Sequence, residues 1–313
     1  MIQVLLYSNI ITPILLKYGL TPLTPNWQLL LVILGSTLIC GGGYIINDYF
    51  DTKIDRINRP NSMIIGNTLS KKSAMRYYQT ITGIGLVCGL IPALWTQNFT
   101  LGFIFVVTPG MLWFYSASYK RQFLIGNVIV ALSSALSLML PLLLESKAQE
   151  VYYGNVIHET PVIAELYLWI LGFALFAFVW TLIREIIKDV EDIAGDRENE
   201  CRTLPIKWGV KNTRYLLSIC ILLVNGAIFY ISKFCITFPL QNQLSNIYYR
   251  YLIGIPSVVL IFLLYMKSSK NWQYASKLTK VIMLLGILYS FAFYYLMATN
   301  FDILVFGIFS VAN

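Results

Sequence analysis

The sequence has 313 residues, of which 57% are hydrophobic and only 12% are charged, and its mean hydropathy is +0.67. A water-soluble core could not bury so much apolar surface over this length, so the composition excludes a soluble globular protein and indicates an integral membrane protein. The formal net charge is +8. Basic residues beside apolar spans normally set membrane topology, so this charge does not imply a nucleic-acid partner.

Apolar stretches of helical length recur along the whole chain, without the alternating ten-residue pattern of an outer-membrane barrel. The sequence therefore predicts an all-α, polytopic membrane fold with about nine transmembrane helices. We expect these helices at residues 2–18, 27–46, 73–96, 99–118, 124–144, 162–187, 212–234, 249–266 and 278–299. No Gly/Ser-rich or Pro-rich linker divides the chain, so residues 1–313 are predicted to form one transmembrane domain.

The basic residues predict the orientation of the chain. Of the 23 Lys and Arg, 19 lie in or beside the connections after the second, fourth, sixth and eighth predicted helices. The other four are Lys17, Lys147, Lys233 and Arg250. The positive-inside rule then places the even-numbered connections in the cytoplasm, together with the aspartates of residues 47–55 and 188–196 and the active site that they are expected to form, while the acidic connection 145–161 faces outward. We expect a multi-pass protein of the cell membrane, inner or plasma.

Two stretches of the chain are copies of one pattern, Asn47 to Asp55 and Lys188 to Asp196. Each has three aspartates at positions i, i+3 and i+7, and 141 residues separate each aspartate from its counterpart: Asp48, Asp51 and Asp55; Asp189, Asp192 and Asp196. At about 100° per residue these positions fall within an arc of roughly 60° on a helix. We therefore predict two pseudo-repeated halves that bring two carboxylate stripes face to face around a central cavity.

Rows of carboxylates beside Arg and Lys indicate a particular chemistry. Carboxylates alone repel an anionic substrate, whereas Mg²⁺ takes one or two protein carboxylates and completes its shell with water and substrate phosphates. The expected substrate at a membrane surface is an isoprenyl diphosphate with its tail in the bilayer part of the cavity. With a single histidine, His158, in a polar connection and five cysteines without metal or redox spacing, zinc, haem and Ser-His-Asp chemistry are disfavoured.

Several runs of residues resemble one known family. They are the two aspartate stretches, Ile57 to Pro60, Tyr115 to Arg121 with Gly126-Asn127, Arg184 to Lys188, and Arg202 to Pro205. Over nearly its whole length the chain resembles the UbiA superfamily of intramembrane prenyltransferases. Within that superfamily it is most similar to the digeranylgeranylglyceryl phosphate synthases, and less so to chlorophyll and homogentisate prenyltransferases.

The resemblance implies a UbiA-like fold, Mg²⁺ as cofactor and roles for particular residues. The implied metal ligands are Asn47, Asp48, Asp51, Asp55, Asp189, Asp192 and Asp196. The implied diphosphate-binding residues are Arg59, Lys120, Arg121, Lys188 and Asn127, and the implied catalytic residues are Asp51, Asp55, Asp192, Asp196 and Lys120. The aromatic rings of Tyr44, Phe50, Tyr115, Tyr119 and Trp180 are expected near the site, where they could stabilise an allylic cation or simply form an interfacial belt.

The acceptor and the role of some residues stay open at this stage. Geranylgeranylglyceryl phosphate is the first choice of acceptor, and an aromatic ring such as homogentisate, dihydroxynaphthoate or a chlorin is the alternative. A cation-coupled transporter and a non-enzymatic scaffold are alternatives of other classes, and no obligate protein partner is indicated. Asn127 could pack between helices rather than bind substrate, and Arg184 with Glu185 could be a structural intramembrane pair.

Overall fold

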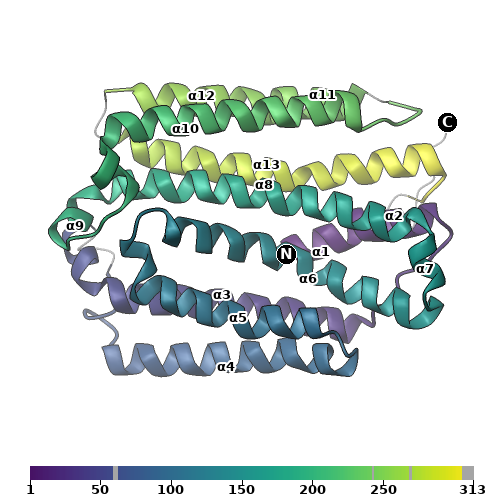
Figure 1. The fold of residues 1–313 in the computed structure, drawn as a ribbon, viewed down its shortest axis with the longest axis horizontal. Helices are drawn as coiled ribbons and strands as arrows, with labels where there is room; N and C mark the ends of the chain where they lie inside the picture. The colour runs from purple at the N-terminus through teal and green to yellow at the C-terminus, as the bar shows by residue number, and fades with distance from the viewer. Residues whose placement is uncertain (59–62, 242, 268–269, 305–313) are drawn as a thin grey trace.

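The computed structural model describes residues 1–58, 63–241, 243–267 and 270–304. Within these ranges the regular secondary structure is helical, apart from one isolated bridge between Ile65 and Leu69. The helices pack side by side as one elongated bundle (Figure 1). This architecture agrees with the all-α polytopic fold that the sequence predicts.

Eight helices of the described chain are long and apolar enough to cross a membrane. They are α3 (Asn26–Asn58), α4 (Lys71–Trp95), α5 (Phe99–Ala117), α6 (Ile125–Tyr153), α8 (Pro161–Glu191), α10 (Leu204–Tyr230) with η4 (Ile231–Cys235), α11 (Gln243–Tyr248) with η5 (Tyr249–Gly254) and α12 (Ile255–Tyr265), and α13 (Asn271–Phe301). A shorter apolar helix, made of α1 (Ile2–Leu6), η1 (Tyr7–Ile11) and α2 (Thr12–Lys17), corresponds to the first predicted helix. The prediction of about nine helices is therefore confirmed.

Three short helices lie in the connections: η3 (Tyr119–Arg121), α7 (Val156–Glu159) and α9 (Ile193–Glu198). The connections that contain η3 and α9 lie at the same end of the bundle, whereas α2, α7 and the C-terminal end of the described chain lie at the opposite end (Figure 1). The four even-numbered connections of the sequence prediction thus meet at the α9 end. This arrangement gathers most of the basic residues at one end.

One predicted connection is wrong. Residues 145–153 were expected in the outward-facing connection, but α6 continues through them to Tyr153. The side chain of Glu145 is fully buried. Its carboxylate accepts hydrogen bonds from the Tyr7 hydroxyl at 2.6 Å, the Leu23 backbone N–H at 2.9 Å and the Gln149 amide at 2.7 Å. A buried carboxylate that is hydrogen-bonded in this way does not need water, so the charge does not end the helix.

Glycines let α3 and α4 approach each other closely. A Cβ atom added at Gly35 of α3 would lie 2.7 Å from the carbonyl oxygen of Gly85 on α4, and one added at Gly85 would lie 2.9 Å from the carbonyl oxygen of Gly35. Small residues at such contacts are typical of helix packing in membranes, where shape complementarity replaces the hydrophobic drive. This packing fixes α3, whose last turns carry the first aspartate stretch.

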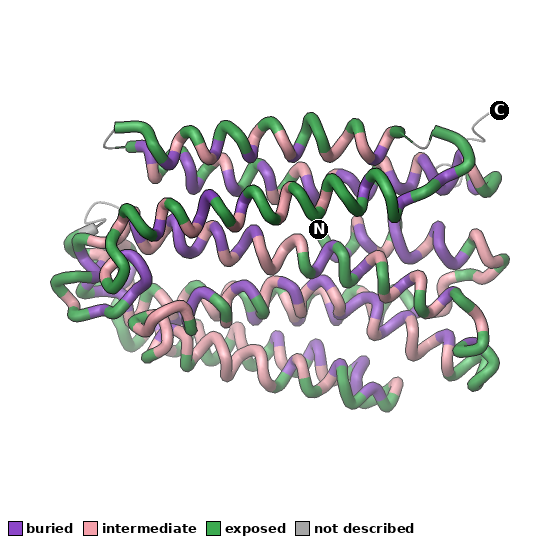
Figure 2. Tube along the Cα trace, turned by 45° about the horizontal axis from the view of Figure 1, so that its top comes forward, coloured by how far each residue is buried: buried purple, intermediate pink, exposed green. Residues whose placement is uncertain are grey.

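The outer faces of the bundle are apolar. Exposed residues follow the outward sides of the helices and buried residues face the interior (Figure 2). Large hydrophobic side chains are among the most exposed, such as Phe99 at 89%, Leu94 at 76% and Phe262 at 67%. Such surfaces are suited to lipid rather than water, as expected for a protein that spans a membrane.

Candidate functional site

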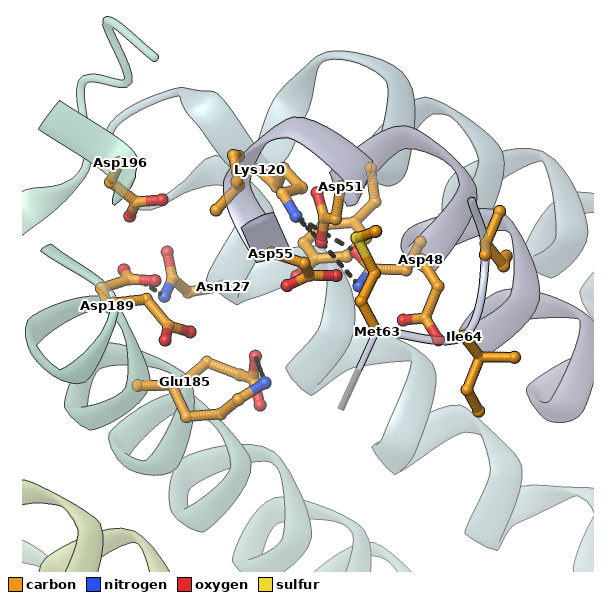
Figure 3. Close-up of a pocket in the computed structure, with 16 residues that line it drawn as sticks. Asp48, Asp51, Asp55, Met63, Ile64, Lys120, Asn127, Glu185, Asp189 and Asp196 are labelled. Atoms are coloured by element: carbon orange, nitrogen blue, oxygen red, sulfur yellow. Dashed lines mark hydrogen bonds and ion pairs between the residues drawn. The ribbon is translucent and has the colours of Figure 1, made fainter. Parts of the chain in front are cut away.

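A cavity of about 210 Å³ opens among α3, η3, α6, α8 and α9, at the α9 end of the bundle. Figure 3 shows its lining residues, which come from both halves of the chain. All seven residues proposed as metal ligands line it: Asn47, Asp48, Asp51, Asp55, Asp189, Asp192 and Asp196. The two aspartate stretches therefore face one cavity, as their repeated spacing predicts.

The first stretch is a continuous helix. α3 extends from Asn26 to Asn58, so Asp48, Asp51 and Asp55 form one stripe that borders the cavity. Asp51 is only 7% exposed, and its carboxylate accepts a hydrogen bond from the Asn47 amide at 2.9 Å. It also forms an ion pair with Lys120.

Lys120 reaches the first stripe because of the turn that precedes α6. It lies in the short helix η3, and its ammonium also approaches Asn47 Oδ1 at 3.4 Å. A Cβ atom added at Gly126 would lie 2.7 Å from the Lys120 Cα and 3.0 Å from the Tyr119 carbonyl oxygen. Only glycine leaves room for η3 to pack this closely on α6. The lysine is thus held over the cavity by backbone packing.

The second stretch departs from the predicted helical stripe. α8 ends at Glu191, and Asp192 has φ −95° and ψ 8°, after which α9 begins a new helix. Asp189 therefore lies on α8 and Asp196 on α9, and the prediction of one continuous stripe is wrong for this copy. Both carboxylates still line the cavity because the chain turns at Asp192.

Asn127 joins the two halves of the site. It is 7% exposed, near the start of α6, and its amide donates a hydrogen bond of 2.8 Å to Asp189 Oδ2. The side chain lines the cavity in Figure 3. Its position favours a place in the site over the alternative of simple helix packing.

The cavity carries an excess of negative charge. Among the described residues, seven carboxylates line it, those of the six aspartates and of Glu185, against two lysines, Lys120 and Lys188. Burial raises the pKa of Asp196 from 3.8 to about 6, and the neighbouring carboxylates of Asp192 and Asp51 add to the effect, whereas Lys120 opposes it. Protonation or a bound cation would relieve this repulsion.

The donor set suits Mg²⁺ in combination with a phosphate. Within the described ranges, no group of three or more His, Cys, Asp or Glu side chains converges closely enough to enclose a metal ion on its own. The oxygen donors instead lie along the two sides of the cavity. Mg²⁺ needs only one or two carboxylates when water and substrate phosphates supply its other ligands, so this open arrangement fits the ion.

Some predicted residues lie elsewhere. Arg121 is exposed and does not line the cavity, and its backbone carbonyl accepts a hydrogen bond of 2.7 Å from the Arg202 backbone N–H. Arg59 lies outside the described residues. Trp180 is fully buried in a core cluster with Ile183 and Ile187, so the expectation that it lies at the site is wrong.

Of the remaining aromatic residues expected at the site, one lines the cavity. That residue is Tyr115, near the end of α5. Phe50 packs edge-on against Trp113, with ring centroids 5.7 Å apart, and Tyr119 packs against Phe114. Tyr44 is 72% exposed. These three contribute to packing or to the outer surface.

Glu185 is a lining residue that the sequence analysis treated only as half of a structural pair. Its carboxylate accepts a hydrogen bond of 2.7 Å from Arg184 and lies 3.6 Å from the Lys188 ammonium. It also lines the cavity. The sequence could have indicated this position, because Glu185 lies four residues before Asp189 and residues i and i+4 share a helix face. Met63, Ile64 and Ile65 of the α3–α4 connection also border the cavity, and no pattern in the sequence marks them.

The bundle spans a membrane and carries, at one end, a cavity rich in carboxylates and lined by lysines. These features are typical of intramembrane enzymes that act on substrates with a charged head and an apolar tail. The chain matches the UbiA prenyltransferase family over residues 10–285, and it belongs to that family. The reaction class is therefore prenyl transfer, and the transporter and scaffold alternatives are set aside.

Individual relatives agree with this assignment. The chain is 30% identical to a digeranylgeranylglyceryl phosphate synthase of Methanosphaera stadtmanae over 86% of this chain and 88% of the relative. It is 31% identical to the enzyme of the same name from Sulfurisphaera tokodaii, over 80% of this chain and 78% of the relative. The resemblance thus extends over most of both relatives.

Solved structures share the fold. A UbiA homologue from Aeropyrum pernix K1 superposes with a TM-score of 0.62 at 13% identity, over 92% of this chain and 96% of the other. A UbiA homologue from Archaeoglobus fulgidus, bound to GPP and Mg²⁺, superposes with a TM-score of 0.52 at 13% identity, over 93% and 98%. Because both sequence identities are low, these superpositions establish the fold of the chain and nothing further.

Proposed function

We propose that this chain catalyses Mg²⁺-dependent transfer of a prenyl group from an isoprenyl diphosphate to geranylgeranylglyceryl phosphate. The observation that carries the proposal is the single cavity lined by both aspartate stretches and by Lys120 and Lys188. The names of the curated relatives support this acceptor, and the homologue bound to GPP and Mg²⁺ supports the donor and the metal. An aromatic acceptor is the alternative that the experiment below decides.

The residues of the cavity divide into those that would hold the metal and those that would bind the diphosphate. Oxygen ligands for Mg²⁺ would come from Asn47, Asp48, Asp51, Asp55, Asp189, Asp192 and Asp196. When bound, the ion supplies positive charge that stabilises the departing diphosphate. Lys120 and Lys188 would donate hydrogen bonds to diphosphate oxygens, and these bonds strengthen as negative charge develops there.

In the proposed reaction, the bond between C1 of the prenyl group and the diphosphate oxygen breaks, and its electron pair leaves with the diphosphate. The ring of Tyr115 lies where it could face the allylic cation without trapping it. The acceptor hydroxyl oxygen then bonds to C1 and gives its proton to a carboxylate of the cavity. A weak base is enough for this step because a cation is already present.

We also propose that the cavity faces the cytoplasm across the cell membrane. The connections at its end of the bundle carry most of the Lys and Arg, which the positive-inside rule assigns to the cytoplasmic side. A cysteine placed at exposed Lys72, in a variant whose native cysteines are serines, should react with an impermeant maleimide only after the membrane is opened. Labelling of intact right-side-out vesicles would place the cavity on the other side.

The function is tested with protein purified in detergent, given Mg²⁺, radiolabelled geranylgeranyl diphosphate, and either geranylgeranylglyceryl phosphate or an aromatic acceptor. We expect radiolabelled ether lipid, none in EDTA, and a loss of about 100-fold or more in Asp51→Asn and in Asp192→Asn, the typical effect of removing one charge-stabilising group. The matched control is Glu198→Gln, an exposed residue of α9 outside the cavity lining.

The possible results lead to different conclusions. Product with the glyceryl phosphate alone supports the proposal in full. Product with an aromatic ring alone keeps the mechanism and overturns the acceptor. Turnover that survives EDTA and both Asp→Asn substitutions would overturn the role of the cavity itself.

A further inference from the structure

α10 and α12 lie side by side at one edge of the bundle (Figure 1). A second hollow is lined by residues of α10, η5 and α12 and shares no lining residue with the carboxylate cavity. Its volume is about 390 Å³. Its two uncharged polar residues are satisfied within their own helices, since Asn225 donates to the Ile221 carbonyl at 2.8 Å and Ser257 to the Ile253 carbonyl at 2.6 Å. We call this hollow the α10–α12 groove, and its wall is apolar apart from one charged residue, Arg250.

Two cations lie near one aromatic ring at the end of the groove that Arg250 lines, which we call its mouth. The Arg250 guanidinium lies 5.5 Å from the centroid of the Phe229 ring, and the Lys233 ammonium lies 5.8 Å from the same centroid. Both basic side chains are exposed. Each comes from a π-helical segment, η4 or η5, and such segments occur often at functional sites.

These two cations differ from the other basic residues outside the cavity end. Lys17 forms an ion pair with Glu165 at 2.8 Å, and Lys147 forms one with Glu150 at 3.1 Å. Among the residues that the structure describes, Lys233 and Arg250 have no carboxylate partner. The mouth of the α10–α12 groove therefore carries two uncompensated positive charges beside an apolar surface.

The length of the groove matches one leaflet of a bilayer. On the η5–α12 helix its lining runs from Arg250 to Ile261, which is eleven steps of about 1.5 Å and therefore about 16 Å along a helix axis. The hydrocarbon core of a membrane is about 30 Å thick, so one leaflet is about half of that. A molecule with its charge at Arg250 and its chain along the groove would occupy one leaflet.

We propose that the α10–α12 groove binds an anionic phospholipid of the bilayer. Its phosphate would interact with Arg250 and Lys233 at the mouth, and one of its chains would lie along the apolar wall that includes Ile221 and Ile261. Charge complementarity selects the anionic head, and the leaflet-length apolar wall selects a lipid over a free phosphate. The site is separate from the cavity and independent of the acceptor proposed above.

The test is native mass spectrometry of the delipidated full-length protein, titrated with phosphatidylglycerol or phosphatidylcholine in detergent. We expect one phosphatidylglycerol to remain bound at concentrations where phosphatidylcholine is lost. The double variant Lys233→Gln/Arg250→Gln should weaken phosphatidylglycerol binding about thirtyfold, because each basic residue near a membrane surface contributes about fivefold to the attraction for an anionic lipid. Lys147→Gln is the matched control, since this lysine has its own carboxylate partner, and it should change nothing.

A second variant separates the apolar wall from the charges. Gly254 lines the groove, and a Cβ atom there would meet only the Tyr249 carbonyl oxygen at an ordinary 3.5 Å, so Gly254→Leu should fold and fill the groove. We expect it to lose phosphatidylglycerol with both cations intact. Equal retention of the two lipids, retention by the double variant, or a protein dimer that forms in place of the lipid adduct would overturn the proposal.

Discussion

Gly126→Ala tests whether the close packing of η3 on α6 sets the position of Lys120. The added Cβ would lie 2.7 Å from the Lys120 Cα and 3.1 Å from the Lys120 backbone nitrogen. Carbon atoms pack best at about 3.5–4.0 Å, so η3 must move away from α6 by roughly 1 Å. Both contacts are with backbone atoms, which cannot rotate away as a side chain would.

The size of the effect follows from that displacement. A 1 Å shift of a group that contacts the reacting atoms costs about 100-fold in rate, which is about 2.7 kcal/mol of transition-state stabilisation. The free energy of unfolding should also fall, by about 1–3 kcal/mol, as for other overpacked sites. The assay is kcat/KM for the prenyl diphosphate, together with the thermal unfolding midpoint in the same detergent.

Gly172→Ala is the matched control. Gly172 is exposed on α8, and a Cβ atom there meets nothing within 4 Å, so the substitution should leave kcat/KM unchanged and the unfolding midpoint unchanged or slightly higher. If Gly126→Ala behaves like Gly172→Ala in both measurements, the close approach of η3 does not position Lys120 and the reasoning is refuted.

Two further predictions concern buried carboxylates. Glu145→Gln replaces an acceptor of several hydrogen bonds and should lower the free energy of unfolding by about 1–3 kcal/mol, and an unchanged denaturation midpoint would contradict this. Burial raises the pKa of Asp196 from 3.8 to about 6. Between these two pH values the folded protein holds a proton that the unfolded chain has released, so the free energy of unfolding should fall as pH rises from about 4 to about 6. Because Mg²⁺ competes with that proton, the gain in unfolding midpoint from Mg²⁺ should grow between pH 5 and 7, and Asp196→Asn should flatten that rise.

The sequence predicted the architecture well because its strongest patterns are physical necessities of a membrane. Apolar spans predict the number of helices. The 141-residue repeat predicts that residues such as Asp51 and Asp196 share one cavity, as the structure shows, and this prediction needs no information about helix packing. The repeat could not show that α8 ends at Glu191, because no Gly or Pro marks that position. The two copies share a spacing but not a backbone conformation.

Other features depend on contacts between distant residues. Glu145 looks like a loop residue until Tyr7 and Leu23 are found to donate to its carboxylate. Trp180 is expected near the site from the sequence, yet its ring is buried in the core. Packing among all the helices decides which face of a helix contacts which neighbour. The local sequence around a residue therefore says little about its contacts.

The turn at Asp192 makes the two sides of the cavity mechanically unequal. Within α3 the helical backbone fixes the rise between Asp51 and Asp55 at about 6 Å, and the glycine contacts with α4 hold that helix in place. Between Asp189 and Asp196 no continuous helix fixes the spacing, because Asp192, with φ −95° and ψ 8°, separates α8 from α9. One duplicated motif thus occurs in two backbone settings, a continuous helix in α3 and a helix break between α8 and α9, so under the proposed function one set of metal ligands would keep a fixed spacing while the other could adjust to the diphosphate.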